Sequence, residues 1–353
     1  MHNHMRIAQI APLFESVPPR WYGGTERVVA YLSDELVRQG HDVTLFASGD
    51  SRTLARLVPV CPQALRLDSS CRDHVAWHVL QVEQVAQRAA AFDLLHFHVS
   101  QIHYPIVRRL DVPHVTTLHG RLDLPELDWL YREFRDVPLV SISDAQRTPL
   151  RHATWAATVP HGLPADLLRF NPRGGEYLAF LGRISPEKRV DRAIEIARAL
   201  GRPLRIAAKV DRVDEEYFDE RIRPLLDDPL IEFIGEIGES AKSDFLGGAR
   251  ALLFPIDWPE PFGLVMIEAL ACGTPVVAYR RGSVPEVLED GVTGFLVETM
   301  PEAIAAAARA GTLDRQACRL AFERRFSAPT MARRYVEVYD TLIQRSPAGQ
   351  AVA

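Results

Sequence analysis

The sequence contains few cysteines and no long apolar run. Its four cysteines show neither CxxC spacing nor a disulfide framework, and reduced thiols in the cytosol are the simplest account of Cys61, Cys71, Cys272 and Cys318. No apolar stretch reaches the length of a membrane span, and the first residues lead into a predicted strand rather than a signal peptide. We therefore expect a cytoplasmic protein.

Two widespread nucleotide-binding motifs are also absent. A dehydrogenase would carry G-x-G-x-x-G in the turn after its first strand, but the corresponding turns of this chain carry Gly23-Gly24 and Gly182-Arg183. The nearest approach to a P-loop precedes Lys242 and has Ala241 where the motif requires glycine. Hydride transfer and P-loop hydrolysis are therefore disfavoured.

The composition is that of a globular protein. At 353 residues the chain is long enough for two domains of ordinary size. Apolar residues make up 47% of it and charged residues 25%, which is typical of soluble proteins. The formal net charge of −5 argues against a nucleic-acid partner, because affinity for a phosphate backbone comes from an excess of Lys and Arg.

Predicted strands and helices alternate in two successive series. The first series has a helix over 25–39 and strands near 5–11, 42–47, 93–97, 114–118 and 138–142. Between 156 and 175 the pattern gives way to a linker rich in Pro and Gly. The second series has helices over 187–200, 214–226, 239–248 and 263–272 and strands near 177–181, 204–208, 230–234, 251–254 and 275–278. Three helices close the chain at about 301–345. The pattern predicts an α/β protein with two doubly wound parallel sheets that face each other across a cleft.

The strongest chemical signal follows the strand predicted over 251–254. Leu264–Ala271 is apolar except for Glu268, and a carboxylate in a buried helix is costly unless it receives hydrogen bonds. Gly263 lets the backbone approach a ligand, and the free N–H groups of the helix start suit a phosphate. With Glu260 nearby, the segment predicts a nucleotide site in which a carboxylate holds ribose hydroxyls. The alternative is a structural helix in which Glu268 pairs with an arginine.

A second signal follows the strand over 177–181. The chain turns at Gly182 and is predicted to enter a helix near Pro186. Arg183 and Lys188 therefore lie at the carboxyl end of a strand, where open α/β sheets bind ligands. Two cations there can neutralise a diphosphate. The alternative is a solvated helix start with ordinary surface charges.

These motifs resemble those of glycosyltransferase family 4, the retaining, nucleotide-sugar-dependent enzymes of the GT-B fold. The resemblance covers nearly the whole chain and rests on Gly23-Gly24-Thr-Glu, His119-Gly120, Arg183-x4-Lys188, Glu260-x7-Glu268, Arg325-Phe-Ser and Tyr335-Val-Glu-Val-Tyr. It implies a Rossmann-like acceptor-binding domain over 1–165 and a Rossmann-like donor-binding domain over 172–327. A last helix over 328–345 would return to the first domain.

The resemblance also implies roles for the motif residues in donor binding. Arg183 and Lys188 would bind the diphosphate, helped by the backbone of Gly23 and Gly24. Glu268 would hold the ribose hydroxyls. The donor sugar would be faced by Glu260 and by the backbone of Phe262, Gly263 and Leu264, and the nucleobase would lie against Ile237 and Lys242. With His119 near the hydroxymethyl group of the sugar, the expected catalytic residues are His119, Arg183, Lys188 and Glu260.

The sequence gives fewer indications of the residues that contact the acceptor. Trp21 and Tyr22 could stack on an acceptor or anchor their loop to the core, and His98 is expected on the same side. His96 and His98 point to one face of a strand and, with His103, could be read as a metal cluster. No Asp or Cys partner accompanies them, so a structural or acceptor-side role is favoured and no metal site is predicted.

The implied reaction is retaining transfer of a hexose from a nucleoside diphosphate sugar to a hydroxyl acceptor, by a metal-independent front-side mechanism. UDP-glucose is the first expectation for the donor and GDP-mannose the second. The nucleotide sugar is a co-substrate, and no further cofactor is implied. The alternatives are glycoside hydrolysis by the two carboxylates, sugar-nucleotide 2-epimerisation, and a non-catalytic protein that binds nucleotide sugars.

Clustered arginines in the C-terminal helices leave one further interaction open. Such clusters are usually solvated helix faces, but they could also give a weak peripheral association with the inner face of a membrane. The cluster consists of Arg319, Arg324, Arg325, Arg333 and Arg334. The sequence does not specify the acceptor, the linkage formed or the oligomeric state.

Overall fold

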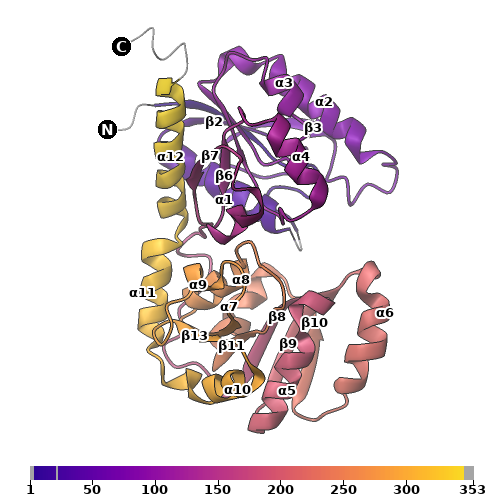
Figure 1. Ribbon diagram of the computed structural model, residues 1–353, viewed down its shortest axis with the longest axis vertical. Coiled ribbons are helices and arrows are strands. Elements are labelled where there is room, and N and C mark those ends of the chain that lie inside the picture. The colour runs from indigo at the N-terminus through magenta and orange to yellow at the C-terminus, as the bar shows by residue number, and fades with distance from the viewer. Residues whose placement is uncertain (1–3, 21–22, 346–353) are drawn as a thin grey trace. The chain divides into compact units, whose positions relative to one another are not determined.

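The computed structural model describes residues 4–20 and 23–345, which form two compact units. Unit 1 comprises the described residues up to Pro164 together with those from Ala328 onward, and unit 2 comprises Ala165–Ser327. Each unit is built on one parallel sheet with helices, so the α/β class predicted from the alternating pattern is confirmed (Figure 1).

Unit 1 contains a seven-stranded parallel sheet with the order β3-β2-β1-β4-β5-β6-β7. Its strands are β1 (Arg6–Ile10), β2 (Asp42–Ser48), β3 (Arg56–Cys61), β4 (Leu94–Phe97), β5 (His114–Thr117), β6 (Leu139–Ser141) and β7 (Trp155–Thr158). Its helices are α1 (Gly24–Arg38), α2 (His74–Ala86), α3 (Tyr104–Val107), α4 (Pro125–Glu133) and α12 (Ala328–Arg345). The strand order reverses between β1 and β4, so the loops after these two strands open at a topological switch point.

The last helix of the chain belongs to unit 1. Helix α12 packs against α1, as Figure 1 shows in yellow and indigo, and the expected return to the first domain is confirmed. Tyr335 and Tyr339 are one turn apart on its buried face and are fully inaccessible to solvent. This face places two hydroxyl groups in the interior of the unit, where each requires a hydrogen-bond partner.

Unit 2 contains a six-stranded parallel sheet with the order β10-β9-β8-β11-β12-β13. Its strands are β8 (Leu178–Ile184), β9 (Leu204–Val210), β10 (Ile231–Gly235), β11 (Ala251–Phe254), β12 (Val276–Tyr279) and β13 (Gly294–Val297). Its helices are α5 (Val190–Leu200), α6 (Glu215–Tyr217), α7 (Glu239–Gly247), α8 (Leu264–Ala271), α9 (Val284–Val287), α10 (Met300–Arg309) and α11 (Arg315–Arg325). Here the order reverses between β8 and β11, the two strands that precede the predicted donor motifs.

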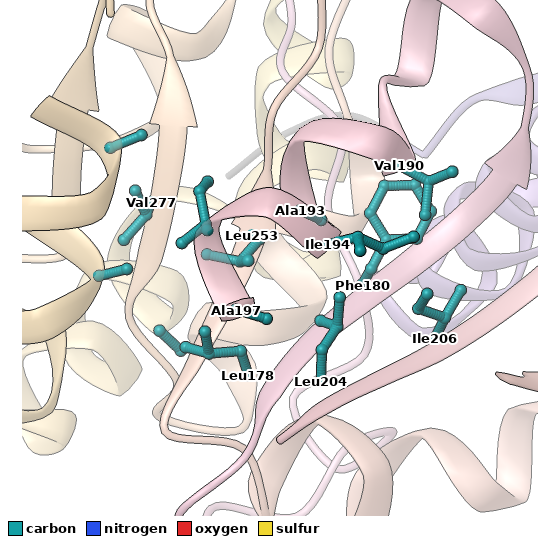
Figure 2. Close-up of a cluster of buried hydrophobic side chains, with 14 of the residues drawn as sticks. Leu178, Phe180, Val190, Ala193, Ile194, Ala197, Leu204, Ile206, Leu253 and Val277 are labelled. Carbon is teal, nitrogen blue, oxygen red and sulfur yellow. The ribbon is translucent and has the colours of Figure 1, made fainter. Parts of the chain in front are cut away.

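The core of unit 2 forms where α5 covers the sheet. Val190, Ala193, Ile194 and Ala197 follow the helical spacing i, i+3, i+4, i+7 and are all buried. Figure 2 shows them in one cluster with side chains of β8, β9, β11 and β12, which include Leu178, Phe180, Leu204, Ile206, Leu253 and Val277. Strands β8 and β11 also pair directly, and the candidate site is built on the segments that follow these two strands.

The structure corrects the pattern in three places. Strands β3, β7 and β13 were not predicted, and all three are edge strands, which pair on one side only and carry mixed burial. The segment predicted as a linker from residue 156 therefore begins inside β7. The helix predicted over 214–226 is a series of short 3-10, α and π turns, with Pro224 within the last of them.

Candidate active site

A buried ion pair joins the turn after β8 to the loop after β11. Lys188 ends the 3-10 turn Pro186–Lys188, and its ammonium donates to Oε2 of Glu260. The indole N–H of Trp258 donates to the same oxygen at 3.0 Å. The ammonium also lies 5.1 Å from the ring centroid of Trp258 and 5.6 Å from that of Phe254. Two donors and two aromatic faces thus stabilise charges that are mostly removed from water.

The helix that follows Lys188 begins later than predicted. Arg189 adopts a left-handed conformation with φ 53°, the one non-glycine residue with positive φ among those the structure describes. Its guanidinium is held by Asp191 at 2.8 Å and by Asp257 at 3.1 Å. Helix α5 starts only at Val190, so Lys188 belongs to a separate turn rather than to the helix. The ion pairs hold a backbone conformation that costs energy in a non-glycine residue.

Arg183 lies near the carboxyl end of β8 among three carboxylates. Its guanidinium contacts Glu187 at 2.7 Å, Asp211 at 3.6 Å and Asp214 at 3.7 Å. Burial raises the pKa of Asp214 despite the opposing effect of Arg183. Sequence reasoning selected Arg183 but missed Asp211 and Asp214, which follow the neighbouring strand β9. Lys209, also on β9, pairs with Asp211 at 2.8 Å.

A second buried ion pair links α8 to α7. Glu268 is 3% exposed, and its Oε1 accepts a hydrogen bond from Nζ of Lys242 at 2.8 Å. The partner of Glu268 is therefore a lysine and not the arginine that the structural alternative predicted. The same lysine also contacts Glu239 at 3.3 Å. Two residues expected at the nucleoside, Glu268 and Lys242, are therefore brought together.

Glycines position Glu260 outside α8. Gly263 has φ +79° and precedes the first residue of the helix, Leu264. Gly282 has φ +53°, and a Cβ there would lie 2.3 Å from the carbonyl oxygen of Glu260. Ser283 donates its backbone N–H to the same carbonyl at 2.9 Å and its hydroxyl to the carbonyl of Phe262 at 2.9 Å.

Gly282 and Ser283 were not selected from the sequence. Their one signal is a Gly-Ser step between a buried strand and Pro285. The structure also describes two other residues that were expected to bind the nucleotide sugar. The ring of Phe262 is buried against Phe326, and Ile237 lies partly buried in the loop between β10 and α7.

In unit 1, the predicted glycines lie at the start of α1. Gly24 is the first helical residue and Gly23 the N-cap, where a Cβ would meet the ring of Pro19 at 2.9 Å. The close approach of Pro19 therefore requires a glycine at position 23. Trp21 and Tyr22, expected on the acceptor side, lie outside the described residues.

His119 follows β5 in unit 1 and is joined to His98. Nε2 of His119 lies 2.9 Å from Nδ1 of His98, and its ring stacks on His161 with centroids 5.2 Å apart. The residue is partly exposed, yet its Nδ1 is inaccessible to solvent and makes no hydrogen bond within the described part of the chain. Burial lowers the pKa of His119 to about 3, so the ring is neutral at physiological pH.

The other histidines that suggested a metal cluster are hydrogen-bonded. The rings of His96 and His98 are 4.0 Å apart, as expected for side chains on one face of a strand. His103 bonds Thr116 at 2.7 Å and stacks on Phe97 instead. Over residues 4–20 and 23–345, no group of three or more His, Cys, Asp or Glu side chains is arranged to hold a metal ion.

Two arginines of the C-terminal cluster are engaged by the backbone. Arg319 donates to the carbonyl groups of Ala165, Leu168 and Ala271, the last of which ends α8. Arg325 donates to the backbone of α9 and pairs with Glu289 at 2.9 Å. These contacts favour a structural role for both residues over lipid binding.

Comparisons with known proteins agree with this architecture. The family model described as "Glycosyl transferases group 1" matches residues 169–320, and that described as "Glycosyltransferase Family 4" matches residues 22–172. The phosphatidyl-myo-inositol mannosyltransferase of Mycolicibacterium smegmatis is 27% identical over 357 residues, which cover 92% of this chain and 88% of that protein.

Two solved structures share the fold over almost the whole chain. AviGT4, a glycosyltransferase involved in avilamycin A biosynthesis, is 25% identical with a TM-score of 0.75 over 97% of this chain and 98% of that one. HepE of Anabaena in complex with UDP and glucose is 21% identical with a TM-score of 0.72 over 96% of this chain and 100% of that one.

Two parallel α/β sheets, with a last helix that returns to the first of them, define the GT-B class of glycosyltransferase. The chain belongs to glycosyltransferase family 4, in the group 1 glycosyl transferases. Among the helices of the described residues, none combines the length and the apolarity of a membrane span.

Proposed function

We propose that this glycosyltransferase moves a hexose from a nucleoside diphosphate sugar to a hydroxyl acceptor with retention of anomeric configuration. UDP-glucose and GDP-mannose are the two donor candidates. A protein of the same fold that was solved in complex with UDP and glucose supports the first, and the name of the mycobacterial mannosyltransferase supports mannose as the sugar of the second.

The observation that carries this proposal is the pairing of both carboxylates of Glu260-x7-Glu268 with lysines. Lys188 holds Glu260 and Lys242 holds Glu268, and both pairs follow strands at the carboxyl edge of the unit 2 sheet. An isolated buried carboxylate would be costly, and each lysine supplies both a charge and a hydrogen bond. The arrangement is suited to ribose and sugar hydroxyls beside a diphosphate.

In the proposed reaction, the bond between the anomeric carbon and the β-phosphate oxygen breaks. The acceptor oxygen forms its new bond on the same face, and the departing phosphate oxygen takes the acceptor's hydroxyl proton. Arg183 and Lys188 neutralise the charge that develops on the leaving diphosphate. Because these cations belong to the protein, the scheme needs no metal ion.

Donor binding would require Arg183 to exchange partners. Its contact with Glu187 joins side chains that are each about one-third exposed, at 33% and 32%, and such pairs are weak. A diphosphate can therefore replace Glu187 at modest cost. The Lys188–Glu260 pair is better buried, and we propose that it persists while the free N–H groups at the start of α8 face the donor sugar.

We propose supporting roles for residues of unit 1. The backbone of Gly23 and Gly24 at the start of α1 would bind phosphate, and His119 would contact the sugar. In this scheme residues 1–165 form the acceptor-binding domain, residues 172–327 the donor-binding domain and residues 328–345 the crossing helix. The neutral imidazole of His119 suits a hydroxyl ligand, which needs a hydrogen bond rather than a charge.

Two observations disfavour the alternatives. A hydrolase needs one carboxylic acid and one carboxylate acting as a pair, whereas each glutamate here is engaged by its own lysine. A non-catalytic binding protein would not need the Lys188 turn held next to Glu260 by a strained Arg189. A 2-epimerase is distinguished by its product.

A thermal-shift series with UDP, GDP, UDP-glucose and GDP-mannose tests the site. A ligand present at a hundred times its Kd adds about 2.7 kcal/mol of stability. We expect the shift to disappear in Glu268→Gln and to persist in Glu239→Gln, since Glu239 contacts the same lysine but is 37% exposed. An unchanged shift in Glu268→Gln would refute the assignment. Product analysis of the anomeric configuration then separates transfer, hydrolysis and epimerisation.

A further inference from the structure

A continuous chain of hydrogen bonds runs through the interior of unit 1 and begins on α12. The hydroxyl of Tyr335 lies 2.9 Å from Oγ1 of Thr117, which lies 2.7 Å from Nε2 of His96. Nδ1 of His96 lies 2.7 Å from the hydroxyl of Tyr339. The two tyrosines of the last helix are thus joined through one histidine of the sheet.

The chain continues from Tyr339 to His119. The amide nitrogen of Gln9 donates to the Tyr339 hydroxyl at 3.1 Å, and its amide oxygen lies 2.8 Å from Nε2 of His98. Nδ1 of His98 lies 2.9 Å from Nε2 of His119. Gln9 and Tyr339 are fully buried and His98 is 4% exposed, so water does not compete for these bonds.

The Gln9 amide gives this chain a direction. A neutral imidazole carries one N–H, so a ring that donates through one nitrogen accepts through the other. Because the amide oxygen of Gln9 accepts from Nε2 of His98, Nδ1 of His98 must accept from Nε2–H of His119. The remaining lone pair of His119 is then on Nδ1, the nitrogen that makes no hydrogen bond within the described residues.

We propose that Tyr339, Gln9 and His98 are positioning residues that fix the tautomer of His119, with the ring proton on Nε2 and an unprotonated Nδ1. The inference rests on the proposed transfer function, in which His119 contacts the sugar. It also gives the last helix a role in the site. Helix α12 supplies the hydroxyl that orients Gln9, and through Gln9 it acts on a histidine that follows β5.

Two tyrosine variants on the same helix separate positioning from packing. Tyr339→Phe removes the hydroxyl that holds the Gln9 amide and leaves the ring. Tyr335→Phe removes an equally buried hydroxyl one turn away. This hydroxyl is at the end of the series of hydrogen bonds that is farthest from His119. We expect Tyr339→Phe to lower kcat by about 10-fold with a smaller change in the donor KM, and Tyr335→Phe to change kcat by less than about 2-fold.

A spectroscopic measurement tests the tautomer without a turnover assay. In protein labelled with 15N-histidine, Nδ1 of His119, assigned by its loss in His119→Gln, should resonate as an unprotonated ring nitrogen. Tyr335→Phe should keep this signal, and Tyr339→Phe should shift it toward the average of two tautomers. A protonated Nδ1 in the wild-type protein, or identical spectra and rates for the two variants, would overturn the proposal.

The two readouts keep this proposal distinct from the proposed function. If no nucleotide sugar is turned over, the proposed transfer function is refuted. The nitrogen spectrum then still decides whether the hydrogen bonds from Tyr339 to His119 fix the tautomer of His119. If transfer occurs and the spectrum is as expected, but His119→Ala and Tyr339→Phe both retain full kcat, the contact between His119 and the sugar is refuted.

Discussion

The two units of this chain use different polar chemistry in their interiors. All twelve histidines of the sequence precede residue 165, so unit 2 contains none. Of the 41 basic residues only three are lysines, and all three lie in unit 2: Lys188, Lys209 and Lys242. Unit 1 buries neutral rings joined by hydrogen bonds, whereas unit 2 buries lysine–glutamate ion pairs at its site.

The difference matches what each unit is proposed to bind. A diphosphate requires positive charge, and a lysine supplies it as a compact point charge that also satisfies a buried carboxylate. A sugar hydroxyl requires a donor or an acceptor with little charge, which a neutral histidine provides. Burial keeps His96, His98 and His119 neutral by lowering their pKa, so unit 1 gains hydrogen-bond specificity at little electrostatic cost.

The largest effect should come from removing a cation of unit 2. We expect Lys188→Ala to lower the transfer rate by about 10³-fold, because it removes charge from the diphosphate and leaves Glu260 with Trp258 as its remaining side-chain donor. Lys209→Ala is the matched control, since this lysine is 30% exposed and pairs with Asp211. Steady-state kinetics would measure the transfer rates of both variants. Equal rates for the two would show that Lys188 does not act at the donor site.

The second effect tests the backbone that carries Glu260. Gly282→Ala should lower kcat by about 10²-fold, because its Cβ would meet the backbone of Glu260 and displace the ion pair. Gly291→Ala is the control, with a similar positive φ of +75° and no atom within 4 Å of the added Cβ. Both variants share the cost of a Cβ at positive φ, which is roughly 1–2 kcal/mol. A loss of kcat in both would trace the effect to strain rather than to Glu260.

Acid should weaken unit 1 before unit 2. Burial lowers the pKa of His96, His98, His103 and His161 well below the ordinary value. The native rings stay neutral, whereas the unfolded chain takes up protons below about pH 6.5. The contribution of these rings to the free energy of unfolding is therefore fully present above that pH. It is lost as the pH falls, by up to about 1.4 kcal/mol per pH unit for each ring.

Hydrogen exchange resolved by segment measures this difference. Between about pH 7.5 and about pH 5.5, with rates corrected for intrinsic exchange, protection of β1, β4 and β5 should fall. Protection of β8 and β11 should change much less, because unit 2 has no histidine. Parallel losses in both sheets would show that the buried rings do not control the acid response.

The smallest effect concerns the carboxylates around Arg183. Asp214→Asn keeps the size of the side chain and removes one negative charge 3.7 Å from the guanidinium. We expect donor affinity to rise about threefold, in keeping with the weakness of partly exposed pairs. Isothermal titration with the preferred nucleotide would measure it, and a fall in affinity would show that Asp214 orients Arg183 for the donor.

The sequence predicted most of the central strands and the residues of the donor motifs. It did so because buried parallel strands are continuous apolar runs, and because a charge inside such a pattern is conspicuous. Edge strands β3, β7 and β13 escaped because they are only half paired, and β3 carries Pro59. The sequence also did not predict which charged residues pair with each other. Lys242, for example, was expected at the nucleobase and is bonded to Glu268.

The sequence by itself determined the parallel α/β architecture, the family and the charged residues at the strand ends, because strand periodicity and motif spacing are local properties of the chain. Only the tertiary structure decided which of those charges meet and how His119 is held. Gln9, His98, His119 and Tyr339 are separated by up to 330 positions in the chain and become neighbours when β1, β4, β5 and α12 pack together. Partnership between residues so far apart is a consequence of packing, which no short stretch of sequence encodes.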